Sequence, residues 1–134
     1  MISLDLAARL REAGLDWTPA PGDRFALPGR GLDEVFVLSD MTIQVYDLPK
    51  GSVIGFNGTT EWALDDIDKD EAIWLPGEDQ LRDRLGAAFQ RLERVDGRYL
   101  VTTGDRRFVA DRPEDAYGEA LLHQLRDRLP AAPG

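Results

Sequence analysis

The sequence predicts an α+β fold with an antiparallel sheet and about three helices, in the order α-β-β-β-β-α-β-β-α. Strand-forming runs lie next to one another and are joined by turns too short for parallel crossovers. Three further segments carry apolar residues at helical spacing. The length of 134 residues suits one domain and is too short for two ordinary ones. We therefore expect one domain over residues 1–129 and a flexible tail at 130–134.

The first helix is expected at about residues 3–13. Leu6 and Leu10 fall on one face of it, and the Ser3 hydroxyl suits the N-cap position. Gly14 suits the position just after the helix. Two prolines and a glycine in residues 18–23 then favour an extended, turning connection.

A run of strands is expected in the middle of the chain, at residues 24–27, 34–38, 42–47, 52–56 and 60–64. The last two flank Asn57-Gly58, the strongest hairpin signal here, because both residues tolerate the positive φ of a type I′ turn. We interpret these runs as a meander of three to five strands. The acidic segment 65–71 is expected to be a linker.

The second half of the chain predicts two helices around a hairpin. Apolar residues at helical spacing predict a helix at about 77–93, with Pro76 at its first position. Residues 99–102 and 107–110 are expected to form the hairpin. Pro113 opens the last helix, whose inner face is expected to carry Ala116, Ala120, Leu121, Leu125 and Leu129.

Composition excludes several classes of function. Sixteen basic and 25 acidic residues give a net charge of −9, which disfavours nucleic acid as a partner. With no cysteine and one histidine, His123, the chain cannot form disulfides or a multi-histidine metal centre. No apolar run approaches the roughly 20 residues that span a bilayer, and residues 1–6 lack the pattern of a secretory signal. We expect a cytoplasmic protein without a membrane partner.

No catalytic or cofactor motif is complete, so no catalytic, cofactor-binding or metal-binding residue and no cofactor are assigned. In the segment 51–55, Ser52 stands second, whereas a nucleophile elbow places serine at its centre. His123 is interpreted as an ordinary histidine on a helix surface. The spacing of acids in Asp66–Asp70 resembles the start of a calcium loop, but Glu71 replaces the required glycine. A solvated acidic loop is the commoner origin of such a run, and calcium binding stays a hypothesis.

Three tryptophans are the candidate interaction residues: Trp17, Trp62 and Trp74. All lie near the ends of predicted elements, where rings form interface anchors or, more commonly, pack at the edge of the core. The leading hypothesis is a non-catalytic domain that binds another protein or a second copy of itself as a homodimer.

The alternative hypothesis is a small-ligand-binding protein or metal-dependent enzyme. Its site would lie between the sheet and the Pro19–Gly31 loop. Asp23, Arg24 and Glu61 would supply its polar groups, and Trp62 or Trp74 would form a wall. This hypothesis predicts a concave pocket containing titrating groups.

Four segments resemble a family of short actinobacterial proteins of unassigned function: residues 14–25, 34–42, 53–64 and 74–81. The resemblance extends over about residues 2–125. Members often carry the label pilus assembly protein, which implies a P-loop ATPase, whereas this chain has no phosphate-binding loop. The segment 110–116 also resembles a helix start in small proteins of Gram-positive bacteria and their phages, except that Arg112 replaces the usual capping threonine or serine.

Overall fold

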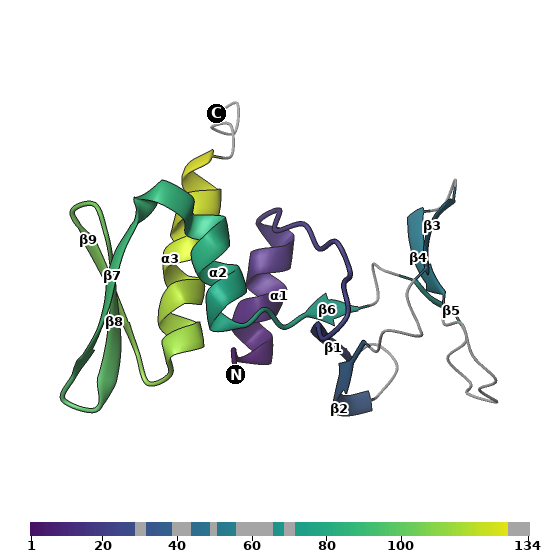
Figure 1. Cartoon of the computed structure of the whole chain (residues 1–134), viewed down its shortest axis with the longest axis horizontal. Coiled ribbons are helices and arrows are strands. Elements are labelled where there is room, and N and C mark those ends of the chain that lie inside the picture. The colour runs from purple at the N-terminus through teal and green to yellow at the C-terminus, as the bar shows by residue number, and fades with distance from the viewer. Residues whose placement is uncertain (29–31, 39–43, 49–50, 56–65, 69–71, 129–134) are drawn as a thin grey trace. The chain divides into compact units, whose positions relative to one another are not determined.

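The computed structural model describes residues 1–28, 32–38, 44–48, 51–55, 66–68 and 72–128 (Figure 1). The fold is α+β, as predicted, and its sheets are antiparallel. The chain divides into two compact units. The first contains residues 1–16 and 76–134, and the second contains residues 17–75. That both belong to one domain over 1–129 stays a prediction, and residues 130–134 lie outside the described chain.

Three helices build the core of the first unit: α1 (Leu4–Glu12), α2 (Glu78–Leu85) and α3 (Pro113–Arg128). The first begins as predicted, because the Ser3 hydroxyl accepts a hydrogen bond from the Leu6 N–H at 3.2 Å. It packs on α3 at Gly118, where a Cβ atom would lie only 2.6 Å from Leu6 Cδ2. Glycine therefore lets the two helices approach closely.

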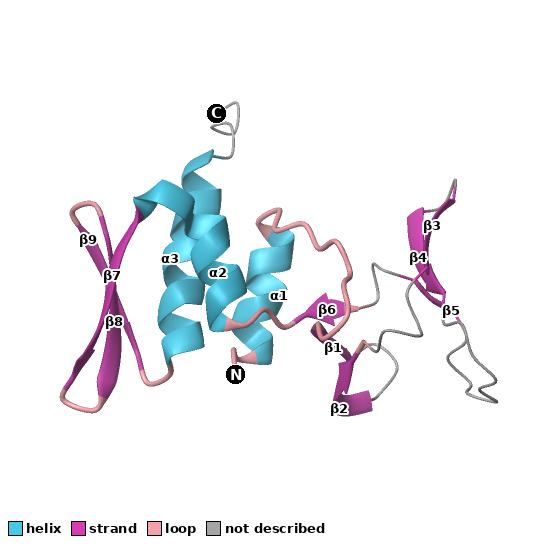
Figure 2. Cartoon of the chain, in the orientation of Figure 1, coloured by secondary structure: helices cyan, strands magenta, loops and turns pink. Residues whose placement is uncertain are grey.

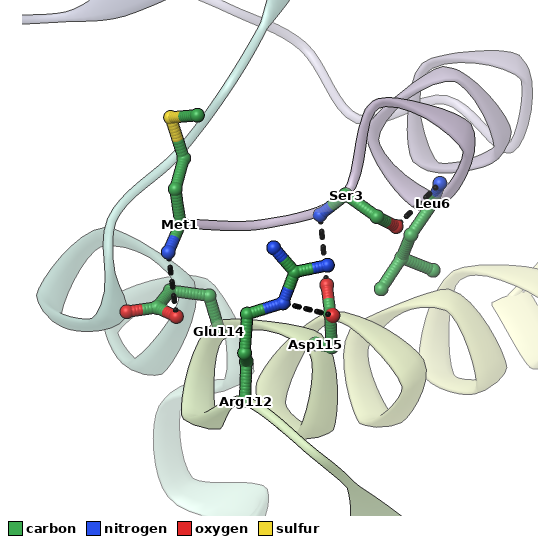
Figure 3. A network of polar contacts seen from close by, with 6 residues as sticks. All are labelled: Met1, Ser3, Leu6, Arg112, Glu114 and Asp115. Atoms are coloured by element: carbon green, nitrogen blue, oxygen red, sulfur yellow. Dashed lines mark hydrogen bonds and ion pairs between the residues drawn. The ribbon is translucent and has the colours of Figure 1, made fainter.

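The start of α3 is held by Asp115 (Figure 3). Its Oδ1 accepts a hydrogen bond from the Ser3 N–H at 2.8 Å, and its Oδ2 accepts one from Arg112 Nε at 3.1 Å. The carboxylate of neighbouring Glu114 accepts one from the amino group of Met1 at 3.1 Å. The arginine that replaces the usual capping residue thus positions an acid in the first turn, where the helix dipole favours negative charge.

A three-stranded sheet completes the first unit: β7 (Phe89–Val95), β8 (Arg98–Thr103) and β9 (Arg106–Ala110), in that order. The turn between β7 and β8 has positive φ at both Asp96 and Gly97, as a type I′ turn requires. Helix α3 covers one face of the sheet (Figure 2). Its Tyr117 packs on Phe89 with ring centroids 5.5 Å apart.

The expected helix over 77–93 is wrong in its second half. Helix α2 ends at Leu85, because Gly86 adopts φ 61° and ψ −135°, a conformation that side chains exclude. A single 3-10 turn, η3 (Gly86–Ala88), follows, and β7 occupies the rest of the expected helix. Pro76 also precedes the helix rather than opening it, since Gly77 is the N-cap and its N–H donates to Gln80 Oε1 at 2.9 Å.

The second unit contains two further antiparallel sheets. One has the order β2-β1-β6, from β1 (Arg24–Leu27), β2 (Leu32–Val37) and β6 (Ile73–Trp74). The other has the order β3-β4-β5, from β3 (Gln44–Leu48), β4 (Gly51–Gly55) and β5 (Asp66–Asp68). The strands predicted as one meander are therefore divided between two sheets.

The acidic segment 65–71 is not simply a linker. Its residues Asp66–Asp68 form β5, which pairs with β4 so that Gly55 lies opposite Asp66. The strand predicted at 60–64 and the Asn57-Gly58 turn lie outside the described residues. Among the helices that the structure describes, none has the length and apolar character needed to cross a membrane.

Candidate interaction surfaces

The loop before β1 is closed by Asp23, one of the residues selected from the sequence. Its side chain is buried and its Oδ2 accepts hydrogen bonds from Trp17 Nε1 at 2.9 Å and from the Ala20 N–H at 3.0 Å. The backbone beside it pairs with Leu38, whose N–H donates to the Asp23 carbonyl at 2.9 Å. The carboxylate therefore holds the loop to the end of the sheet.

An aromatic cluster lies next to this carboxylate. Trp17 stacks on Trp74 with ring centroids 6.4 Å apart and an interplanar angle of 9°, and it also contacts Phe25 at 5.7 Å. Phe25 in turn stacks on Phe36. Trp17 and Trp74 are 5% and 8% exposed. These two tryptophans belong to the core of the second unit, which is the commoner role weighed for them from the sequence.

The structure thus brings together Trp17, Asp23 and Trp74. Arg24 follows in β1, with an exposed side chain and a carbonyl that accepts from the Leu75 N–H at 2.9 Å. Glu61 and Trp62 lie outside the described residues. The alternative of a ligand-binding or enzymatic site beside the Pro19–Gly31 loop therefore stays a hypothesis.

The sequence also leaves calcium binding at Asp66–Asp70 as a hypothesis and predicts an ordinary helix-surface position for His123. Within the described parts of the chain, no three potential ligands from histidine, aspartate and glutamate gather in a way that could hold a metal ion. The backbone of Asp66–Asp68 is extended and paired, unlike the winding start of a calcium loop, and Asp70 lies outside the described chain. His123 is half-buried on α3, where its ring packs on Phe108 at 5.7 Å and its Nε2 lies 3.2 Å from Asp127 Oδ2.

The face of the β7-β8-β9 sheet opposite α3 presents a surface that is not evident from the sequence. Alternation along the strands directs Leu92, Val101 and Phe108 toward α3, since Phe108 touches His123 there. The residues between them point the other way. We call this second side the outer face; it carries Arg91, Glu93, Val95, Arg98, Leu100, Thr102, Arg107 and Val109, of which Thr102 is buried.

Apolar side chains cross the outer face diagonally. Leu100 in the central strand lies directly opposite Val109 of β9, and Val95 of β7 is its diagonal neighbour. Val95 and Val109 are 47% and 51% exposed. Together with flanking polar residues they line a shallow depression of about 430 Å³.

Guanidinium groups flank this apolar diagonal. Arg91 contacts Glu93, and Arg98 Nε lies 3.4 Å from Asp111 Oδ1. Both pairs are exposed, so they contribute little stability and can exchange for an external carboxylate. Arg107 forms no ion pair with any residue in the described part of the chain. The outer face therefore combines half-exposed valines with available positive charge.

The charge of the chain is distributed unevenly. Residues 86–112 contain six arginines and four acids, whereas residues 32–71 contain ten acids and two lysines. A protein with a net charge of −9 thus carries a locally basic sheet. The hairpin at 99–102 and 107–110 was predicted, and the Asp96-Gly97 dipeptide, a hairpin signal between two β-compatible runs, could also have indicated β7 from the sequence.

Comparison of the chain with protein-family models, curated proteins and solved structures found no match. The resemblance to short actinobacterial proteins therefore stays a prediction.

Proposed function

We propose that this protein is a non-catalytic cytoplasmic domain that binds another protein through the outer face of the β7-β8-β9 sheet. The observation that carries the proposal is the apolar diagonal of Val95, Leu100 and Val109, in which both valines are about half exposed and Leu100 is half-buried. Single exposed apolar residues are common on protein surfaces. Adjacent ones on the open face of a sheet, bordered by arginines, are typical of binding surfaces.

The size of the surface constrains the kind of complex. Burying the remaining exposed area of each valine contributes about 1 kcal/mol, since full burial of such a side chain is worth roughly 1.5–3 kcal/mol. The diagonal alone is therefore too small for a stable complex, which needs about 1,000 Å² of buried surface. The partner must also cover the flanking arginines.

The test compares capture by the wild-type chain with capture by the double variant Val95→Asn/Val109→Asn. Both are immobilised and exposed to lysate of the source cells, and light scattering of each reports self-association. We expect at least one protein, or a second copy of the chain, to bind the wild type and to be lost from the variant.

The matched control is Val35→Asn/Val37→Asn, which alters two exposed valines of β2 in the second unit. It should retain the partner. Loss of binding in this control with full retention in the outer-face variant would place the contact elsewhere and overturn the proposal, as would identical captured material for all three chains.

A further inference from the structure

The free edge of β9 carries backbone groups whose direction follows from the hairpin register. Thr103 and Arg106 flank the two-residue turn Gly104-Asp105, and residues flanking such a turn exchange both backbone hydrogen bonds. Every second residue of β9 from Arg106 onward therefore bonds to β8. The N–H and C=O groups of Arg107 and Val109, which lie between them, point to the opposite side.

No strand of the described chain pairs with that opposite side. β9 is at the edge of its sheet, and no backbone hydrogen bond from the described residues reaches Arg107 or Val109 from outside the β8–β9 pair. A hollow of about 550 Å³ runs beside the strand, between β9 and residues of α1 and α3. The hollow leaves space along the edge for an extended chain.

We infer that the β9 edge binds an extended segment of a partner protein as a fourth strand, with acidic and apolar side chains on the outer face. This inference rests on the proposed function, and it specifies how the partner binds. The added strand would satisfy the outward backbone groups of Arg107 and Val109. Its outer-face side chains would lie beside these two residues, where a carboxylate pairs with Arg107 and an apolar group extends the diagonal at Val109.

The arginines of β9 determine which kind of strand can bind at its edge. Charged residues at a strand edge commonly prevent edge-to-edge association, and Arg106 and Arg107 are both exposed on β9. Two β9 edges brought together would place arginines close to arginines, which disfavours a second copy of this strand. The same charges attract an acidic segment, so the edge discriminates between partners by charge.

The acidic side chains in the hollow do not strongly repel an acidic segment. The three carboxylates that line the hollow are already paired: Asp115 with Ser3 and Arg112, Glu119 with Arg9 at 3.5 Å, and Asp111, just after β9, with Arg98 at 3.4 Å. Positive groups thus offset their negative charge. Among the described charged residues that line the hollow, Arg107 is the one without an ion pair, so an incoming acidic strand meets available positive charge there.

The probe is a capped nine-residue peptide that alternates glutamate with valine or threonine, compared with a counterpart that has lysine in place of glutamate. Binding to the full chain is followed by NMR titration and by amide hydrogen exchange. We expect saturating glutamate peptide to slow exchange of the Arg107 and Val109 amides about tenfold or more. The lysine peptide should bind at least about tenfold more weakly.

Two variants separate strand addition from other contacts. Val109→Pro removes an outward N–H that the β8–β9 pairing does not use, and proline is tolerated at such edge positions; it should weaken binding of the glutamate peptide about tenfold. Val109→Thr keeps the N–H and the branched shape, and it should bind within about twofold of wild type. If Val109→Pro fails to fold, Arg107→Glu replaces it with the same expected loss, and Arg94→Glu on the other edge strand is its control.

The outcomes distinguish this inference from the proposed function. Peptide-induced shifts at Val95 and Leu100 without slower exchange at Arg107 and Val109 would overturn strand addition and leave the outer face as a binding surface. Equal affinity for both peptides would overturn the charge selection. Absence of binding by the glutamate peptide would overturn the inference even if the outer-face variant loses a captured partner.

Discussion

The Asp115 carboxylate joins the beginnings of two helices that are far apart in the sequence. Its Oδ1 accepts a hydrogen bond from the backbone N–H of Ser3, 112 positions earlier, at 2.8 Å (Figure 3). That N–H has no partner within α1, because it precedes the first turn. One acid near the start of α3 therefore satisfies the start of α1.

Substitution Asp115→Ala should lower the free energy of unfolding by about 1.5–3 kcal/mol, the range for hydrogen bonds to a charged group. Its side chain is 16% exposed, so solvent screens this contact only in part. The measurement is urea unfolding followed by circular dichroism. Asp127→Ala in the same helix is the control; its side chain is 66% exposed and it should change stability by less than about 1 kcal/mol. Equal effects of both substitutions would contradict the role given to Asp115.

The packing of α1 on α3 gives a second prediction. Gly118→Ala should destabilise the protein by about 1–3 kcal/mol, because the new Cβ would lie 2.6 Å from Leu6 Cδ2 and 3.2 Å from Ile2 Cδ1. This cost exceeds the gain in helix propensity, which is at most about 1 kcal/mol.

A double-mutant cycle tests the cause. In Leu6→Ala the clashing methyl group is absent, so adding Gly118→Ala to that variant should cost much less than adding it to wild type. Thermal unfolding of all four chains supplies the coupling energy. Additive effects would show that the cost of alanine arises somewhere other than at Leu6.

In the second unit, the indole of Trp17 and the carboxylate of Asp23 form a buried hydrogen bond at 2.9 Å. Trp17→Phe removes the donor and part of the ring volume, so we expect stability to fall by about 2–4 kcal/mol.

Because Trp17 stacks on Trp74, the far-ultraviolet circular dichroism of the wild type should contain an excitonic couplet that this variant loses. Arg24→Ala alters an exposed neighbour and should keep the couplet; a couplet that survives Trp17→Phe would contradict the stacking.

The sequence predicted best those elements whose signals are local. Ser3 and Gly14 mark the ends of α1 through capping chemistry that needs no distant partner, and the structure places the helix between them. The hairpin of β8 and β9 likewise follows from strand-forming runs around a short turn. Pairing over longer distances was not predictable in this way: nothing local indicates that Asp66 lies opposite Gly55.

The candidate site was harder to predict than the fold. Trp17 and Trp74 stand out by residue type, yet stacking between them depends on pairing of β1 with β6, and both rings are buried. Val95 and Val109 belong to different hairpins, and neither is unusual by itself. They share the outer face only because β7 and β9 both pair with β8, so the surface is a property of the sheet.

The error in the predicted helix over 77–93 leads to the last prediction. Leu81 and Leu85 continue at helical spacing to Phe89 and Leu92, so periodicity alone favours one long helix. Gly86 prevents it, because its φ of 61° and ψ of −135° direct the chain out of the helix.

Gly86→Ala should therefore lower stability by about 1–3 kcal/mol, the cost of holding a side chain in that conformation. The control is Ala88→Gly, which leaves Gly86 intact and should cost less than about 1 kcal/mol. Chemical denaturation measures both, and a stable Gly86→Ala variant with increased helical circular dichroism would show instead that residues 86–93 can extend α2.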